Sequence, residues 1–344
     1  MRFLLHMVLA SLAILFLLSG SMSAQWISEV GFDDSDMAID LIEAKSFQKY
    51  PTYDQYLQMM QDFASDYPAI CRLDTFGISE EGRLLLALEI SDQVEVDEPE
   101  ASFLYSSSMH GDEIVGYVLL LRLAESMLSA YGQDPEVTTL VNGLSIWINP
   151  LANPDGSFSN DNNLSLGNAS RFNSRGIDLN RNFPDPGSGD DDDTEGRARE
   201  TKYMMELMRE ERFTLSANIH SGEEVVNYPW DYAPHLHVDD NWFRFISREY
   251  ADEAKAVDPD YMFGWDNGIT NGWQWYEARG TRQDYISYYL GGREVTLELS
   301  TVKLLPSMQL EHYWNINKRS LLNYMAQCMY GLSLIHISEP TRLC

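Results

Sequence analysis

The sequence predicts an α/β protein built on a central mixed β-sheet with helices on both faces. Apolar runs of strand length alternate with segments of helical periodicity along most of the chain, which is the pattern of layered α/β folds. Of the 344 residues, 44% are hydrophobic, which is enough to bury a sizeable core. The sequence contains no internal repeat, so solenoids and other repeat architectures are excluded.

The expected elements follow one another along the chain. Residues 53–67 are predicted to form a helix, because Tyr53, Tyr56 and Phe63 fall on one face of it together with Met60. Strands are expected where short apolar runs occur, at 84–90, 103–107, 144–148, 215–219 and 295–299. Helices are expected at 114–128, 202–212, 242–254 and 310–329.

The N-terminus is typical of a secretory signal peptide over residues 1–24. Arg2 precedes an apolar run, 8–18, and the small residues of 21–24 follow it. The run is shorter than the ~20 apolar residues that span a bilayer, although an uncleaved anchor stays open as an alternative. We therefore expect a secreted, extracytoplasmic protein, periplasmic or extracellular, with no stable membrane span after cleavage.

Three further segments are distinguished by composition. Residues 25–49 read as an acidic N-terminal leader, which we expect to be mobile. Residues 50–331 carry the alternating pattern and are expected to form the folded domain. The string L-S-L-I-H-I-S-E-P-T-R-L-C at 332–344 lacks periodicity, and we interpret it as a non-native tail.

Composition excludes several classes of function. The formal net charge of −29 would repel nucleic acid. The same charge attracts cationic ligands, or it serves only to keep the protein soluble. The cysteines are Cys71, Cys328 and Cys344, too few for a disulfide framework and without the C-x-x-C spacing of a thiolate metal site. Whether Cys71 pairs with Cys328 stays open.

Candidate metal ligands lie at the ends of two predicted strands. His110 and Glu113, in H-G-D-E, follow one strand, and His220 ends another before Ser221-Gly222. A catalytic zinc ion takes three protein ligands of nitrogen or oxygen type and leaves one position open. Each motif alone is also compatible with incidental polar residues.

Two further segments carry polar groups that suit catalysis. Residues 171–184 hold three arginines and three asparagines, which could bind carboxylates or could form structural salt bridges. Glu298 lies within an apolar strand, where an unpartnered carboxylate is costly. Glu294 lies on the same strand face, so strand periodicity does not choose between the two glutamates.

Joint occurrence of these motifs gives a specific resemblance. In addition to H-G-D-E, the sequence contains N-P-D-G (153–156), G-I-D-L-N-R-N-F-P (176–184), S-A-N-I-H-S-G (216–222), N-Y-P-W-D (227–231) and T-L-E-L-S (296–300). In this order and spacing they resemble the zinc metallocarboxypeptidases, and most closely the regulatory branch of carboxypeptidases E, N, M and D. The resemblance covers nearly all of residues 50–331.

The resemblance implies a zinc-dependent peptidase that hydrolyses the C-terminal bond of peptides or proteins. It assigns one Zn²⁺ per chain to His110, Glu113 and His220. By the same resemblance, Glu298 is the general base and Arg171 polarises the scissile carbonyl. The clamp for the terminal carboxylate consists of Asn180, Arg181 and Tyr276. Asp178 is the acid that orients a zinc-bound histidine.

The resemblance also implies a substrate preference. Asp231 and Gln283 match the pocket residues that select C-terminal Lys or Arg in the regulatory branch. Arg282 stands where many relatives have Met, and a cation beside Gln283 could weaken that selection. Relatives in this branch carry a transthyretin-like domain after the catalytic domain, and we expect the 332–344 tail to replace a truncated one.

Two alternative functions remain at this point. An inert relative would bind peptides without hydrolysing them, although such proteins usually lose a metal ligand or the base. A zinc amidase of the same fold would act on cell-wall peptides.

Overall fold

The computed structural model describes residues 31–338 except 97 and 161. The predicted signal peptide and the last six residues of the predicted tail lie outside the described residues. Over the described part of the chain, every helix is too short or too polar to cross a membrane.

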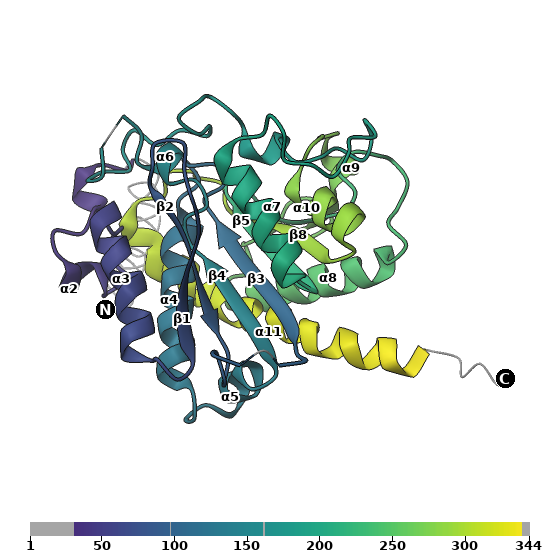
Figure 1. Cartoon of the computed structure of the whole chain (residues 1–344), viewed down its shortest axis with the longest axis horizontal. Helices are drawn as coiled ribbons and strands as arrows, with labels where there is room; N and C mark the ends of the chain where they lie inside the picture. The colour runs from purple at the N-terminus through teal and green to yellow at the C-terminus, as the bar shows by residue number, and fades with distance from the viewer. Residues whose placement is uncertain (1–30, 97, 161, 339–344) are drawn as a thin grey trace, which may run out of the picture.

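The fold is built on a mixed eight-stranded sheet (Figure 1). Its strand order is β1-β2-β4-β3-β5-β8-β6-β7. The central strands β4, β3, β5 and β8 run parallel, whereas β1, β2 and β6 introduce antiparallel pairs. The strands are β1 (Cys71–Ile78), β2 (Leu84–Ile90), β3 (Ala101–Ser107), β4 (Leu144–Asn149), β5 (Leu215–His220), β6 (Glu223–Tyr228), β7 (Ile269–Asn271) and β8 (Arg293–Ser300).

Helices cover both faces of this sheet, which confirms the predicted α/β class. Consecutive residues of a strand point to opposite faces and pack into different cores: Phe103 belongs to one cluster and Leu104 to the other. The larger core contains residues of α3 (Tyr53–Asp66), α4 (Val115–Ala130), α5 (Pro135–Val141), α8 (Asp240–Val257) and α11 (Leu310–Ser338). The smaller core contains residues of α7 (Arg199–Glu211) and α10 (Arg282–Tyr285).

All five predicted strands are present, each within a few residues of its expected bounds. The sequence did not predict β1, β6 and β7. The predicted helices correspond to α3, α4, α7, α8 and α11. The remaining short elements are η1 (Asp34–Asp36), α2 (Leu41–Ala44), α6 (Pro154–Ser157), η2 (Leu179–Arg181), α9 (Gly272–Trp275), η3 (Ile286–Leu290) and η4 (Ser307–Gln309).

The described part of the acidic leader is folded against the domain, in contrast to the mobile segment that composition suggests. Asp36 is buried, and its Oδ1 accepts hydrogen bonds from the backbone N–H (2.8 Å) and the hydroxyl (2.6 Å) of Ser307. The buried Tyr50 hydroxyl donates to the carbonyl of Leu305 at 2.8 Å. The leader and Tyr50, the residue that follows it, therefore contact the segment that joins β8 to α11.

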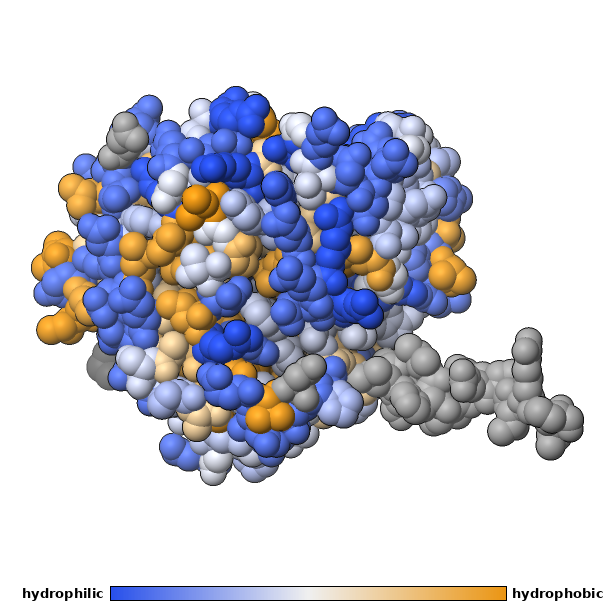
Figure 2. Space-filling model, viewed as in Figure 1, coloured by the Kyte–Doolittle hydropathy of each residue, from blue (hydrophilic) through white to orange (hydrophobic). Residues whose placement is uncertain are grey.

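The surface agrees with the acidic composition. On the face seen in Figure 2, hydrophilic residues predominate and apolar ones form small scattered groups. Cys71 and Cys328 are both buried and free, so the structure contains no disulfide between them. At the C-terminal end, α11 runs on to Ser338, past the start of the predicted tail at 332.

Candidate active site

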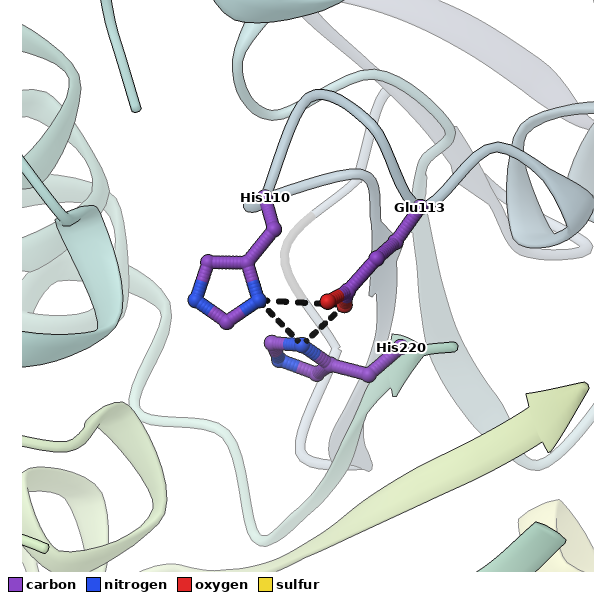
Figure 3. A group of neighbouring side chains, drawn as sticks. All are labelled: His110, Glu113 and His220. Carbon is purple, nitrogen blue, oxygen red and sulfur yellow. Dashed lines mark hydrogen bonds and ion pairs between the residues drawn. The ribbon is translucent and has the colours of Figure 1, made fainter. Parts of the chain in front are cut away.

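Three side chains, two of them neighbours in sequence and one more than 100 residues away, converge on one point (Figure 3). Nδ1 of His220 lies 3.0 Å from Nδ1 of His110 and 2.8 Å from Oε2 of Glu113. Nδ1 of His110 lies 3.0 Å from the same carboxylate oxygen. Ligands of one tetrahedral zinc ion lie about 3.3 Å apart at bond lengths of ~2.0–2.1 Å, so this triangle fits one ion with a small expansion.

The sheet explains why these residues meet. His110 and Glu113 follow the carboxyl end of β3, and His220 is the last residue of β5, the parallel neighbour of β3. The chain leaves β3 toward β4 on one side and later enters β5 on the other, and ligands bind at such switch points of open α/β sheets. Gly111 makes room for this turn, since a Cβ there would lie 2.2 Å from the backbone of Gly156.

Both histidines are oriented through their second ring nitrogen. Nε2 of His110 lies 3.1 Å from Oδ1 of Asp178, and Nε2 of His220 lies 2.7 Å from the side-chain amide of Asn218. The Asp178 carboxylate accepts the Nε2 proton of His110 and so fixes the tautomer that leaves Nδ1 of this ring free for a metal. Oε2 of Glu113 also accepts the backbone N–H of Ser221 at 3.2 Å.

The protonation states of His220 and Glu113 suit a metal ion. Burial lowers the pKa of His220 to about 4, so its imidazole is neutral at pH 7. Burial opposes ionisation of Glu113, but the charge of His110 and its hydrogen bonds outweigh this effect and hold the pKa of the carboxyl well below its usual range. His220 and Glu113 therefore offer a neutral imidazole and a carboxylate at physiological pH. Burial opposes protonation of His110, but its interactions with Glu113 and Asp178 outweigh this effect and raise its pKa, so a metal at this ring competes with a proton.

A polar pocket opens beside this triangle. This pocket brings together most of the site residues that the sequence predicted. Their functional roles stay predictions. Its lining residues are His110, Arg171, Asn180, Arg181, His220, Asn227, Asp231, Gly272, Trp275, Tyr276, Ala278, Thr281, Thr296 and Glu298.

Three cationic or amide groups lie on one side of the pocket. Nε of Arg171 donates to Oδ2 of Asp178 at 2.9 Å, which holds the guanidinium next to the metal triangle. Nη2 of Arg181 donates to the hydroxyl of Tyr276 at 3.3 Å, and Tyr276 is 48% exposed. Oδ1 of Asn180 accepts from the backbone N–H of Arg282 at 3.0 Å, so its Nδ2 is the group left for a ligand. Such a set of donors suits an anionic ligand.

The structure distinguishes the two glutamates of β8. Glu294 is fully buried and is neutralised by Arg282, with Nη2 2.9 Å from Oε2. Glu298 pairs in register with His220 across the β5–β8 ladder and lines the pocket. Its Oε2 is buried and has no hydrogen-bond partner within the described chain. Burial, and to a lesser extent the charge of Glu113, raises the pKa of Glu298 well above its usual range.

Asp231 lies at the buried end of the pocket. Its Oδ1 accepts from Nδ2 of Asn227 at 3.1 Å and from Nε2 of Gln283 at 2.9 Å. Thr296 donates to Oε1 of Gln283 at 3.1 Å, which fixes the direction of that amide. Gln283 therefore lies behind Asp231. Burial raises the pKa of Asp231, and the donors only partly offset this effect.

Arg282 does not present its charge to the pocket, in contrast to the expectation that a cation beside Gln283 could weaken selection for Lys or Arg. Its side chain is fully buried and ends at Glu294 and Ser106. Proximity in sequence is misleading at this position, because successive residues of α10 point in different directions.

A metal triangle that adjoins an unpartnered carboxylate on an α/β sheet defines the class of metal-dependent hydrolases. The chain belongs to the zinc carboxypeptidase family, whose model matches residues 56–320. It is 38% identical over 309 residues to carboxypeptidase D of Homo sapiens, covering 85% of this chain and 22% of that protein. It is 35% identical over 289 residues to carboxypeptidase M of Mus musculus, covering 79% of this chain and 64% of that protein.

These comparisons confirm the family and the likeness to its regulatory branch. The chain spans about a fifth of the length of carboxypeptidase D, at 22%. Among solved structures, the fold matches that of thrombin activatable fibrinolysis inhibitor with a TM-score of 0.71, at 18% identity over 82% of this chain and 75% of the other. At that identity the match shows a shared fold.

Sequence reasoning missed several residues that build the site. Asn218 contacts the ring of His220, and Asn227 contacts Asp231. Gly272 lies directly against Asp231, since a Cβ there would fall 1.8 Å from Oδ1. Nζ of Lys303 lies 2.9 Å from Oε1 of Glu113. Asn218 and Asn227 lie within the motifs S-A-N-I-H-S-G and N-Y-P-W-D, and this placement was the signal in the sequence that could have identified them as site residues.

Proposed function

We propose that this chain is an active carboxypeptidase that binds one zinc ion and releases C-terminal Lys or Arg from peptides. The observation that carries the substrate preference is the buried Asp231 at the end of a pocket that also offers donors for a carboxylate. We also propose that the protein is secreted, on the basis of residues 1–24, and N-terminal sequencing of the exported protein would test this.

His110, Glu113 and His220 would hold the zinc ion, which when bound lowers the pKa of water and polarises a carbonyl. Glu298 is the proton carrier that the pocket supplies: its raised pKa suits a group that accepts a proton from water and delivers it to the leaving amine. Arg171, fixed by Asp178, supplies positive charge for the oxygen that becomes anionic.

The donors of Asn180, Arg181 and Tyr276 account for attack at the end of a peptide. A terminal carboxylate would satisfy them, whereas an internal peptide bond offers no anion at this position. Because they fix the terminal carboxylate of the substrate, they convert a bimolecular encounter into a positioned one.

The preference for a basic residue follows from the acceptors at the end of the pocket. Asp231 is buried, and Oδ1 of Asn227 is also buried and lacks a partner within the described chain. A Cβ on Gly272 would lie 1.8 Å from Oδ1 of Asp231 and 3.0 Å from Oδ1 of Asn227, so the glycine keeps both acceptors accessible. A guanidinium or ammonium group satisfies them, and an apolar side chain leaves them unpaired at a cost.

Peptides that differ only in the last residue test this proposal. We expect kcat/KM to be highest for C-terminal Arg or Lys and lowest for Phe, and C-terminal amidation should abolish turnover. A diaminopimelate-terminated peptide completes the panel, because its preference over Arg and Lys would favour a cell-wall enzyme. Preferred cleavage of Phe would show that Asp231 does not select the substrate.

Removing the metal should abolish activity. Dialysis against a chelator is expected to give an inactive, folded protein, and zinc should restore turnover at one equivalent per chain, as measured by metal analysis. His220→Ala should lose both zinc and activity, because a structure with two remaining ligands binds the ion poorly. His312→Ala, an exposed histidine on α11, is the matched control and should retain both.

A further inference from the structure

A fully buried ion pair lies beneath the site and belongs to none of the roles described so far. Nε of Arg282 lies 3.0 Å from Oε1 of Glu294, and Nη2 lies 2.9 Å from Oε2. Both side chains have no exposure. Nη1 of Arg282 also contacts the hydroxyl of Ser106, and Ser216 donates to Oε2 of Glu294 at 2.7 Å.

These contacts tie α10 to the middle of the sheet. The guanidinium contacts β3 through Ser106 and β8 through Glu294, and Glu294 in turn accepts from Ser216 of β5, so the network joins α10 to three neighbouring strands. These are the strands that position His110, His220 and Glu298. The ion pair therefore fixes α10 relative to the same framework that carries the metal triangle.

Consecutive residues of α10 in turn hold the substrate-binding side of the pocket. The backbone N–H of Arg282 donates to Oδ1 of Asn180, which orients that amide. Nε2 of Gln283 donates to Asp231 at 2.9 Å. Asp284 accepts the backbone N–H groups of Asp231 at 3.1 Å and of Tyr232 at 2.9 Å. A shift of α10 would move Asn180 and Asp231 together.

We propose that Arg282 and Glu294 are a pair of positioning residues that hold α10 in register with the sheet, and thereby set the distance between the carboxylate-binding side chains and the metal site. The proposal rests on the substrate-binding role of Asn180 and Asp231. A buried ion pair is weak support for stability, because desolvation offsets most of the attraction, but its paired hydrogen bonds restrict geometry. The planar guanidinium is suited to this, since it contacts a carboxylate through two nitrogens at once.

The test compares the neutral double variant Arg282→Met/Glu294→Gln with the unmodified enzyme. The double variant removes both charges, so it leaves no uncompensated ion in the core. We expect it to fold and bind zinc while KM rises about 10- to 100-fold, the usual effect of removing a partner that orients a ligand-binding group. kcat should fall as well, because a clamp that is displaced from the metal site holds the scissile bond out of position.

Two further variants complete the design. Arg282→Lys keeps the charge but loses the second nitrogen contact, so a smaller rise in KM is expected, and it provides the test if the double variant does not fold. Arg122→Met/Glu311→Gln removes a surface ion pair between α4 and α11 and should leave KM unchanged. Zinc content and melting temperature are measured on every variant.

The assay uses whichever C-terminal residue the unmodified enzyme cleaves best. A wrong assignment of the basic preference therefore changes the substrate and leaves the comparison intact. A KM equal to that of the unmodified enzyme in the folded double variant, or in Arg282→Lys if the double variant is unfolded, would overturn the proposal and leave the pair with a purely structural role.

Discussion

Replacing Glu298 by Gln is expected to reduce kcat by about 10²- to 10⁴-fold, the range over which a positioned proton carrier contributes. The amide has the shape of the carboxylate but cannot accept a proton from water. Steady-state kinetics on the best peptide substrate measures the effect, and zinc content should stay at that of the unmodified enzyme. Glu311→Gln, on the exposed side of α11, is the control and should retain full kcat.

The same substitution should stabilise the metal-free protein at neutral pH. Burial raises the pKa of Glu298 in the folded state, so folding takes up a proton above the ordinary glutamate pKa of about 4.3, and stability is lost as pH rises. Gln removes this loss. The melting temperature of the variant should therefore exceed that of the unmodified protein at pH 7, and the difference should shrink as pH falls toward about 4.3. Retained hydrolysis by the variant would exclude Glu298 as the proton carrier.

Replacing Asp231 by Asn is expected to lower kcat/KM for a peptide that ends in Arg by roughly 30- to 5,000-fold. This corresponds to the ~2–5 kcal/mol that the loss of one partner costs a buried charge pair. The amide keeps the size of the carboxylate and can still accept from Asn227, so the pocket should retain its shape. The cost falls on the substrate cation, which loses its counter-charge.

The informative quantity is the ratio between substrates. For a peptide that ends in Phe, kcat/KM should stay constant or rise, because the pocket no longer contains a buried, unpaired carboxylate. Asp191→Asn, in the exposed loop of consecutive aspartates, controls for the loss of one negative charge from an acidic protein. Equal losses on Arg and Phe peptides would mean that Asp231 maintains the pocket without selecting the side chain.

The sequence predicted five consecutive strands of the sheet and missed β1 at one end and the neighbouring β6 and β7 at the other. β2, β3, β4, β5 and β8 are buried along nearly their whole length because helices cover both of their faces, and each contains a short stretch rich in apolar residues. β1 is only partly buried and lacks a clean alternation, β6 begins with two glutamates, and β7 has only three residues. Such strands form because a neighbour offers backbone hydrogen bonds, and that information is absent from the local sequence.

The residues of the metal triangle were candidates because they follow strands that are easy to recognise, and the family resemblance then assigned all three to one zinc ion. His110, Glu113 and His220 follow apolar runs, and parallel neighbours bring their carboxyl ends together. The direction of Arg282 could not be predicted. Its partner Glu294 lies 12 residues away on another element, and the pairing depends on the rotation of a four-residue helix. The close approach of Gly272 to Asp231 likewise depends on tertiary packing.

The contact between the leader and the loop after β8 has a consequence for the order of folding. Tyr50 and Leu305 are separated by 255 residues, and Asp36 and Ser307 by 271. Contacts this distant along the chain form late, because loop closure must come first. This segment, which precedes β8 in the chain, therefore completes its packing only after β8 and the loop that follows it have emerged. Until then the apolar surface that it covers stays open to solvent and to chaperones.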